Sequence, residues 1–443
     1  MVRTRRRTPS VATELEPVLH ALLGGPPPFA LRAYDGSRTG PPDAEVTVEL
    51  HGPDALRHLL WAPGELGLAR AHVSGSLDVD GDIFALLAAR DQMGGAADDV
   101  SVDLGPREWA VLAKAARRLG VVGRRPPRPA EEAVAHGRLH TRGRDAEAIA
   151  HHYDVGNDFY ELLLGPSLTY SCACWYRDGI DLAEAQAAKH ELVCRKLGLA
   201  AGMRLLDVGC GWGSMAIHAA RRHEVEVVAI TISEEQAALA RRRVADSGLG
   251  DRIEVRVQDY RDVHDGPFDA ISSIGMFEHV GAERTAEYLD ALVALLAPTG
   301  RLLNHAISRP DPDQRSGVSA RSFMGRYVFP DAALQEVGTV VTAMARAGLE
   351  VRDVESLREH YARTLRAWVA NLEARWDEAQ QLVGPGRARV WRLYLAGCAL
   401  GFEQGRTSIH QVLAVRPDGA GRSAMPATRS SFVVDADHPV ERR

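Results

Sequence analysis

Three glycines at every second position follow a short apolar run, and this spacing suits the binding of a small cofactor. Residues 203–208 are typical of a buried strand, and Gly209, Gly211 and Gly213 come directly before residues 214–223, which are compatible with a helix. Because glycine has no Cβ, such a turn lets the backbone approach a ligand closely. The spacing is not the G-x-G-x-x-G of a dinucleotide site, and no Gly-Lys-Ser/Thr follows it, which excludes a phosphate-binding P-loop.

An acidic residue next to this turn favours one cofactor. Asp207 stands two positions before Gly209. A carboxylate in that place suits S-adenosylmethionine (SAM), whose aminoacyl end is zwitterionic. On this motif alone we predict a SAM site, with another α/β enzyme or a plain tight turn as the alternatives.

The surrounding elements alternate between strand and helix, which is typical of an α/β fold. Strands are predicted at residues 204–208, 226–230, 253–258, 270–274 and 300–305, with helices between them, for example at 234–246 and 282–296. The prediction is a doubly wound, Rossmann-like sheet with the glycine turn at its first switch point, where open sheets bind ligands. A helical tail at 355–404 and a final strand at 408–415 are expected as additions.

Composition divides the chain into three parts. Its 443 residues are enough for two domains of ordinary size. Residues 1–120 are predicted to be a small α+β domain for lipid positioning or dimerisation, with an alternating strand at 44–50. Residues 121–144 are a predicted linker, and residues 145–443 are the predicted catalytic domain.

The predicted linker is basic and rich in proline. Arg124, Arg125 and Arg128 stand among three prolines, which disfavour helix and strand. In an acidic protein such a segment can contact an anionic membrane surface, each basic residue near the lipid contributing about 1 kcal/mol. A merely solvated linker is the alternative.

Charge and cysteine content exclude several classes of protein. The net charge of −6 argues against general affinity for nucleic acid. The five cysteines form neither an even framework nor a metal-type pair of pairs, so we expect reduced thiols, no metal and a cytoplasmic location. Glu14 and Glu16 interrupt the N-terminal apolar segment, which argues against a signal peptide. No apolar run of about 18 residues predicts a membrane span, so membrane contact is expected to be peripheral, at the inner face.

Several local sequences, taken in order, resemble one known family. They are IAHHYDVGNDFY (149–160), LTYSCA (168–173), the glycine turn, TISEEQ (231–236), QDYRD (258–262), SIGMFEHVG (273–281), HAI (305–307), RYVFP (326–330) and HY (360–361). Together they resemble the cyclopropane-fatty-acyl-phospholipid synthase family, which includes the mycolic-acid cyclopropane synthases. The resemblance covers about residues 145–415 and extends weakly into the N-terminal part.

The resemblance implies a class I SAM-methyltransferase domain, a bound bicarbonate that serves as base, and an acceptor double bond in the acyl chain of a membrane phospholipid. Positions that match the family's SAM site are Tyr170, Ser171, Asp207, Gly209, Gly211, Gly213, Thr231, Ser233, Gln236, Asp259 and Tyr260. Positions that match its bicarbonate site are Cys172, Glu278, His305, Ile307 (through its backbone) and Tyr361. Family members are often dimers, so a homodimer is expected.

The four side chains of the second set have ordinary structural roles open to them when each is taken alone. Cys172 could be a small buried hydrophobe, and Glu278 a capping or surface residue at a strand end. His305 could be a core histidine with satisfied hydrogen bonds. Tyr361 could be an aromatic residue on a helix face.

The chemistry implied by the resemblance needs such a set. An alkene is a weak nucleophile, so it must be held in line with the sulfonium methyl, away from water. Methyl transfer leaves a carbocation on the acyl chain, and a base must remove a proton close to it. Thiol, carboxyl, imidazole, phenol and backbone groups can together hold a small anion for this purpose. A glutamate beside that anion is expected to have a raised pKa.

The identity of the product stays open in the sequence. Deprotonation of the new methyl group gives a cyclopropane, whereas a hydride shift before it gives an exomethylene branch, as in the tuberculostearic acid pathway, where a partner reductase saturates the branch. Cys174 and Asn304 replace residues common in the family, and this puts the product in doubt. The LLNHAI run favours the 10-methylene-stearoyl product from an oleoyl chain, with cyclopropane second. Two different functions are also compatible with the sequence: a methyltransferase of a soluble natural product, and a SAM-binding scaffold for a partner oxidoreductase.

Overall fold

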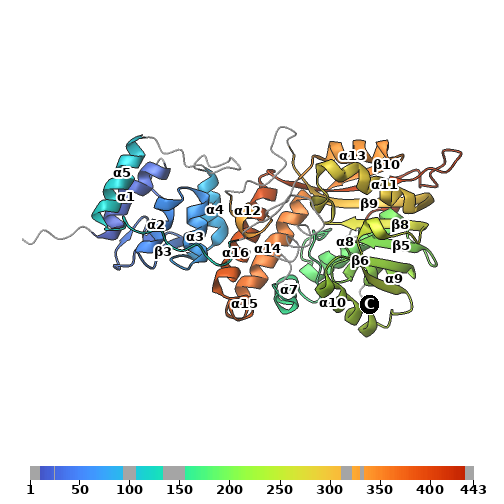
Figure 1. The fold of residues 1–443 in the computed structure, drawn as a ribbon, viewed down its shortest axis with the longest axis horizontal. Coiled ribbons are helices and arrows are strands. Elements are labelled where there is room, and N and C mark those ends of the chain that lie inside the picture. Colours follow the sequence, from blue (N-terminus) through green and yellow to red (C-terminus); the bar gives the residue numbers. More distant parts are fainter. Residues whose placement is uncertain are drawn as a thin grey trace, which may run out of the picture. The chain divides into compact units, whose positions relative to one another are not determined.

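The computed structural model describes residues 10–23, 25–92, 106–132, 155–310, 322–329 and 334–434. The chain forms two compact units (Figure 1). The smaller unit comprises residues 1–135, 319–330 and 376–400, and the larger unit comprises residues 136–318, 331–375 and 401–443. The sequence predicted domain boundaries at residues 120 and 144. In the structure the first segment of the smaller unit ends at residue 135, and two later segments of the chain also belong to that unit.

The larger unit is built on a seven-stranded sheet with the order β10-β11-β9-β8-β5-β6-β7. Its strands are β5 (Arg204–Val208), β6 (Glu226–Thr231), β7 (Ile253–Val257), β8 (Phe268–Ile274), β9 (Leu296–Ser308), β10 (Glu350–Ser356) and β11 (Ser408–Val415). Strands β5 to β9 pair in parallel, and β11 is antiparallel to both β9 and β10. The predicted strands are confirmed, except that β10 was not predicted.

The glycine turn follows β5, the strand at which the sheet order reverses. Strand β5 pairs with β6 on one side and with β8 on the other. The predicted switch point is therefore confirmed. All of β5 after its first residue is buried, as expected for a parallel strand covered on both faces.

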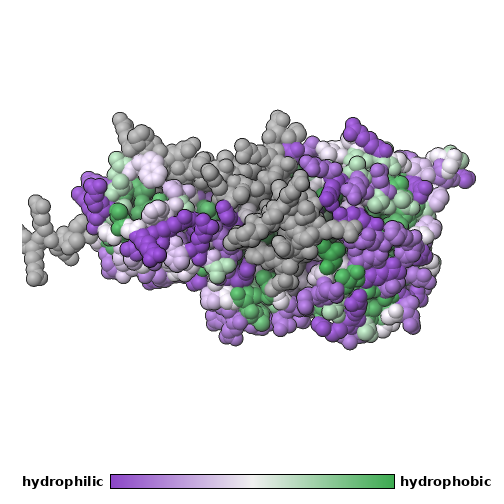
Figure 2. Space-filling model, in the orientation of Figure 1, coloured by the Kyte–Doolittle hydropathy of each residue, from purple (hydrophilic) through white to green (hydrophobic). Residues whose placement is uncertain are grey.

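Two layers of helices cover the sheet, one on each face (Figure 1). One layer packs through Leu205 and the other through Leu206, because successive side chains of a strand point to opposite faces. The first layer is α8 (Leu182–Leu197), α9 (Ser214–His223) and α10 (Glu234–Asp246), and the second includes α11 (Thr285–Leu295) and α13 (Val337–Arg346). Figure 2 shows largely hydrophilic residues over α9, which is the amphipathic pattern of a helix packed on a core.

Further helices and short 3₁₀ turns complete the larger unit. They are α7 (Asn157–Leu164), α14 (Arg358–Ala374), η1 (Tyr260–Asp262), η2 (Phe277–His279), η3 (Ala282–Arg284) and η4 (Arg429–Ser431). Turn η2 follows β8 directly, so it places Glu278 at the carboxyl end of the parallel strands.

The smaller unit combines a four-stranded sheet of order β2-β1-β3-β4 with helices. Its strands are β1 (Ala30–Arg32), β2 (Arg38–Thr39), β3 (Val46–Leu50) and β4 (Leu77–Gly81). Its helices are α1 (Val11–Leu23), α2 (Pro53–Trp61), α3 (Glu65–Val73), α4 (Ile83–Gln92), α5 (Pro106–Arg118), α12 (Phe323–Tyr327), α15 (Trp376–Val383) and all but the last three residues of α16 (Pro385–Glu403).

The first half of the predicted linker packs on this unit. Glu132 forms a buried ion pair with Arg70 of α3, with nitrogen and oxygen 2.7 Å apart. Trp61 donates a hydrogen bond from its indole nitrogen to the carbonyl of Gly123 at 3.3 Å. None of the described helices has the length and apolar composition needed to cross a bilayer.

Candidate active site

A pocket in the larger unit lies at the carboxyl ends of β5 and β6. Nine of the residues predicted to bind SAM line it: Tyr170, Ser171, Asp207, Gly209, Gly211, Thr231, Gln236, Asp259 and Tyr260. Gly213 and Ser233 are not among the lining residues, but both shape the pocket. Gly213 precedes α9, and Ser233 caps α10 by accepting a hydrogen bond from the Gln236 amide at 3.2 Å.

The glycine turn needs the residue type that it has. Gly209, Gly211 and Gly213 have φ values of 77°, 54° and 81°, a left-handed region that costs other residues roughly 1 to 2 kcal/mol. The backbone N–H groups of Gly209 and Cys210 donate to the carbonyl of Ile230, at 3.0 and 2.9 Å. The turn is thereby fixed to β6 with its surface open to a ligand.

Asp207 presents a free acceptor in this pocket. One carboxylate oxygen accepts a hydrogen bond from Ser272 Oγ at 2.7 Å, and the other is buried without a partner among the described residues. Burial raises the pKa of Asp207 to about 6. An unpaired buried oxygen costs about 1 to 3 kcal/mol, and the ammonium group of SAM would satisfy it, so the pocket fits this cofactor.

A buried lysine faces the same end of the pocket. Lys189 of α8 lines the pocket, and its Nζ lies 3.2 Å from Nδ1 of His190. Burial lowers the pKa of Lys189 to about 8. Lys189 was not predicted as a site residue, because nothing in the local sequence shows that this helix position is buried.

Glu278 and Ile307 of the predicted anion site are in direct contact. The backbone N–H of Ile307 donates to Glu278 Oε1 at 2.7 Å, while Oε2 is buried without a partner in the described residues. Burial raises the pKa of Glu278 to about 7, in the predicted direction. The Ile307 amide therefore donates to Glu278 and not directly to an anion. It would act on a bound anion by fixing the orientation of the Glu278 carboxylate.

His305 lies two residues before Ile307 on β9, so both side chains are on the same face of the sheet. Both of its ring nitrogens are buried without a partner among the described residues. Burial lowers the pKa of His305 well below its ordinary value, and the imidazole is therefore neutral. A neutral imidazole can donate one hydrogen bond and accept another.

Gln411 is a residue of this region that was not predicted from the sequence. It stands opposite His305 in the β9–β11 pairing, and both its amide oxygen and its amide nitrogen are buried without partners in the described part of the chain. In the sequence, a polar amide in the middle of the largely apolar strand 408–415 is the one feature that could have marked Gln411 as a site residue. Buried polar groups without partners on Glu278, His305 and Gln411 together fit a small polar ligand.

Cys172 and Tyr361 both contact Leu357, the residue that follows β10. The Cys172 thiol donates to the carbonyl of Leu357 at 3.7 Å, and Tyr361 donates its backbone N–H to the same carbonyl at 3.0 Å. The N–H of Leu357 donates to Ile409, which pairs with Ile307. Burial raises the pKa of Cys172 well above its usual value, so its sulfur is a thiol that can donate a hydrogen bond.

A row of aromatic rings connects the cofactor pocket with Tyr361. Ring centroids lie 4.7 Å apart for Trp212 and Tyr160, 5.6 Å for Tyr160 and Tyr170, 5.4 Å for Tyr170 and Trp368, and 6.0 Å for Trp368 and Tyr361. Trp212 and Tyr170 line the pocket. Ring contacts thus run without a break from the cofactor pocket to Tyr361, one residue of the predicted anion site. Residues 149–154 and Pro330 of the family motifs lie outside the described residues.

Comparison with known proteins identifies the family of the chain. Residues 140–412 match the family described as mycolic acid cyclopropane synthetase. A protein of Mycobacterium tuberculosis named "Probable fatty acid methyltransferase" is 44% identical over 413 residues, covering 91% of this chain and 94% of that protein. A tuberculostearic acid methyltransferase of the same organism is 31% identical and covers 88% of each chain.

Solved structures lead to the same family. The mycolic acid cyclopropane synthase CmaA1, solved with SAH and CTAB, has a TM-score of 0.57 and 35% identity, covering 61% of this chain and 97% of that one. The larger unit of this chain therefore has the class I SAM-methyltransferase fold that the sequence predicted. The chain therefore belongs to the mycolic acid cyclopropane synthetase family and is a SAM-dependent enzyme of the methyltransferase and cyclopropane synthase type.

Proposed function

We propose that the protein transfers the methyl group of SAM to the cis double bond of an unsaturated fatty acyl chain in a membrane phospholipid. Two relatives that span about nine-tenths of the chain are named as fatty acid or tuberculostearic acid methyltransferases, which supports an acyl acceptor. The observation that carries the proposal is the buried Glu278 oxygen without a partner among the described residues, together with the two ring nitrogens of His305, which are buried in the same way. A carboxylate and an imidazole with free hydrogen-bonding capacity, in apolar surroundings, suit a reaction that ends in proton removal.

Atoms and charge balance in this reaction. The C–S bond of SAM breaks as a C–C bond forms to one olefinic carbon, and positive charge develops on the neighbouring carbon. Loss of a proton from the transferred carbon closes a cyclopropane ring, or, after a hydride shift, gives an exomethylene group. SAM would supply the methyl group as a sulfonium, and bicarbonate would supply the base that takes up the proton.

The residues of the chain would place and protect these groups. Tyr170 and Trp368 offer ring faces to the developing cation, at a contribution of about 0.5 to 2 kcal/mol each, and they exclude the water that would convert it to an alcohol. Glu278, raised to a pKa of about 7, can hold or share a proton near neutral pH. His305 and the Tyr361 hydroxyl can donate hydrogen bonds to a small anion, and the Cys172 thiol can do so by turning its proton away from the Leu357 carbonyl.

The product that we favour is the 10-methylene-stearoyl chain made from an oleoyl chain. The support is the LLNHAI run that contains His305, and the tuberculostearic acid methyltransferase among the relatives, which matches the N-terminal part as well. The second candidate is the cyclopropane product, because the structural neighbour at 35% identity is named a cyclopropane synthase. NMR of lipid extracted after incubation with oleoyl phospholipid vesicles decides: new olefinic methylene signals support the first, and ring signals with no olefinic carbon support the second.

A patch on the smaller unit supports contact with a membrane surface. Trp61 and Val122 are 53% and 69% exposed, and the hydrogen bond from Trp61 to Gly123 holds them close together in the fold. Arg124 and Arg125 follow directly and are exposed. Exposed aromatic and apolar side chains next to arginines are typical of segments that lie at the interface of an anionic bilayer. We infer that residues 122–128, with Trp61, dock the enzyme on its lipid substrate.

A further inference from the structure

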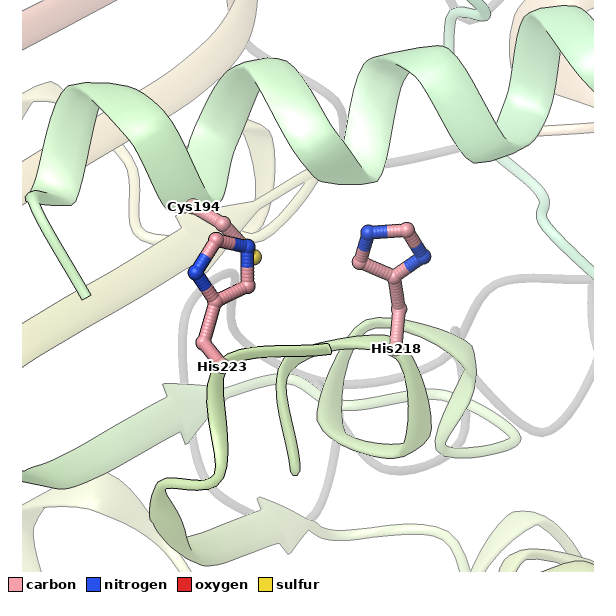
Figure 3. A group of neighbouring side chains, drawn as sticks. All are labelled: Cys194, His218 and His223. Atoms are coloured by element: carbon pink, nitrogen blue, oxygen red, sulfur yellow. The ribbon is translucent and has the colours of Figure 1, made fainter. Parts of the chain in front are cut away.

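Cys194, His218 and His223 bring a thiol and two imidazoles together between α8 and α9 (Figure 3). One ligating atom from each residue lies within 4.8 Å of the other two. Cys194 projects from α8, whereas His218 and His223 belong to α9, where His223 is the last residue. The cluster is thus assembled by the packing of two helices and not by one sequence motif.

Glu191 adds a carboxylate to the cluster. It lies three residues before Cys194 on α8, so both side chains are on the same helix face. Its Oε2 lies 3.1 Å from Nε2 of His218 and 3.2 Å from Nε2 of His223, so two imidazole nitrogens converge on one oxygen. Its Oε1 accepts from Arg195 Nε at 2.9 Å, which fixes the carboxylate in place.

These separations suit a tetrahedral ion with nitrogen, oxygen and sulfur ligands. With bonds of about 2.0 to 2.3 Å to zinc, neighbouring ligand atoms lie roughly 3.3 to 3.6 Å apart. The two nitrogen–oxygen separations are already close to that range. The atoms of Cys194, His218 and His223 lie within 4.8 Å of one another, so a contraction of at most about 1 Å is needed, and a side-chain rotation at the end of α9 can supply it.

Burial and charge favour the same ion. Cys194 is fully buried, whereas the side chains of His218, His223 and Glu191 are 12%, 17% and 12% exposed, which leaves a route from solvent. One thiolate and one carboxylate balance the charge of a divalent cation, and thiolate with imidazole is a donor set that zinc prefers.

We propose that α8 and α9 hold a zinc ion through Cys194 Sγ, one ring nitrogen each of His218 and His223, and the Glu191 carboxylate. Four protein ligands leave no open position, so the site is structural and not catalytic. On binding, the thiol proton and any proton shared between the imidazoles and Glu191 pass to solvent. No metal was expected from the sequence, because the ligands do not follow a metal-type spacing.

A zinc ion at this place would act on the cofactor pocket through the two helices that it joins. Helix α9 begins directly after the glycine turn, and Lys189 and His190 of α8 line the pocket. Fixing the far end of α9 to α8 therefore fixes the turn against Lys189. We expect the zinc-loaded protein to melt at a higher temperature and to bind SAM more tightly than the zinc-free protein.

The test is to measure the metal content of the full-length, tag-free protein. After dialysis against micromolar Zn²⁺ and gel filtration, mass spectrometry of the metal content should find about one zinc per chain, as expected for one closed four-ligand site. Replacement by Co²⁺ should give a thiolate-to-metal charge-transfer band in the near ultraviolet. Cys194→Ser should abolish this band, and His223→Gln should reduce the zinc content well below one per chain.

Two matched controls separate this site from adventitious binding. Cys398→Ser removes another free cysteine, and His264→Gln removes an exposed histidine distant in sequence from the cluster; both should keep full zinc content. If Cys194→Ser does not fold, His223→Gln at the helix end decides by the same measurements. No stoichiometric zinc in the parent, or zinc content and a charge-transfer band unchanged in both cluster variants, overturns the proposal and leaves a hydrogen-bonded cluster.

Discussion

The carboxylate of Glu278 accepts a hydrogen bond from the backbone N–H of Ile307 at 2.7 Å, and its second oxygen is buried without a partner in the described residues. This contact fixes the side chain of a short 3₁₀ turn to the end of strand β9. A carboxyl group held in this way has one face committed to the fold and one face available to a ligand. The arrangement supports a role in proton removal and leads to the first prediction.

Glu278→Gln should lower turnover by about 10²- to 10⁴-fold, the usual contribution of a group that takes part in proton transfer. The amide keeps the shape and can still accept from Ile307, so SAM affinity should change little. Turnover of labelled SAM on unsaturated phospholipid vesicles, with SAM affinity from calorimetry, measures both effects. Glu283→Gln, an exposed glutamate of the next turn, is the control and should keep full activity. Full activity in Glu278→Gln would remove Glu278 from the mechanism.

The same carboxyl should make stability depend on pH. Its pKa rises from 4.5 to about 7 on folding, so the folded state binds its proton more tightly than the unfolded chain. The free energy of unfolding should therefore fall as pH rises through this window and level off above it. Each pKa unit corresponds to about 1.4 kcal/mol, so the upper bound of the effect is about 3.5 kcal/mol.

Chemical denaturation at a series of pH values checks this sign. Relative to the parent, Glu278→Gln should gain unfolding free energy between pH 4.5 and about 7. Asp207, whose pKa is raised to about 6, acts with the same sign, but it is present in both proteins and cancels in the difference. A difference that stays flat across the window would show that the Glu278 carboxyl is solvated in the folded protein.

Gln411→Leu should stabilise the fold while it lowers activity. Both polar atoms of the Gln411 amide lack partners among the described residues, and each such buried group costs about 1 to 3 kcal/mol. Leucine has a similar volume and no polar atom, so the unfolding free energy in bicarbonate-free buffer should rise by about 1 to 3 kcal/mol. Turnover should fall, because the residue stands opposite His305.

Gln335 gives a matched control for that substitution. It is also buried, and its amide oxygen has no partner among the described residues, but its amide nitrogen donates to Thr285 Oγ1 at 2.9 Å. Gln335→Leu breaks this bond and should not stabilise the protein. A loss of stability in Gln411→Leu would mean that the amide has hydrogen-bond partners in solution. The assignment of Gln411 to the anion site would then be wrong.

Replacing Arg124, Arg125 and Arg128 by glutamine should weaken binding to anionic vesicles by roughly 10²-fold, at about 1 kcal/mol for each basic residue near the lipid. Flotation with phosphatidylglycerol vesicles measures the affinity. The control removes the same charge from the larger unit, at the exposed Arg221, Arg242 and Arg346. Equal losses of vesicle affinity in the two variants would indicate a general charge effect. If neither variant lost affinity, the proposed docking surface would be wrong.

Much of the fold could be predicted because the signals are local. The apolar runs that became β5 and β11 have the bounds that the sequence predicted, and α10 begins and ends where it was expected. Strand β10 was missed because it is a polar strand at the edge of the sheet, with one buried residue and no regular alternation. Its strand conformation depends on pairing with β11, which no local pattern shows.

The site was predicted in part for a similar reason. The glycine turn carries its own conformational signature, so the pocket residues near it could be found. Lys189 and Gln411 are site candidates because they are buried with few or no polar partners among the described residues. Their burial depends on segments far apart in the chain, so no local pattern shows it. The engagement of the Ile307 amide by Glu278 is likewise a tertiary contact, and the resemblance alone assigned that amide to the anion.

One measurement tests the proposed reaction most directly: incubation of the full-length protein with oleoyl phospholipid vesicles and SAM that carries a fully deuterated methyl group. If the transferred carbon loses one proton to a base held beside Glu278, mass spectrometry will find an acyl chain that has gained one carbon with two deuterium atoms. This holds for the methylene and the cyclopropane product alike. A chain that keeps all three deuterium atoms, or label in no acyl chain, would contradict it.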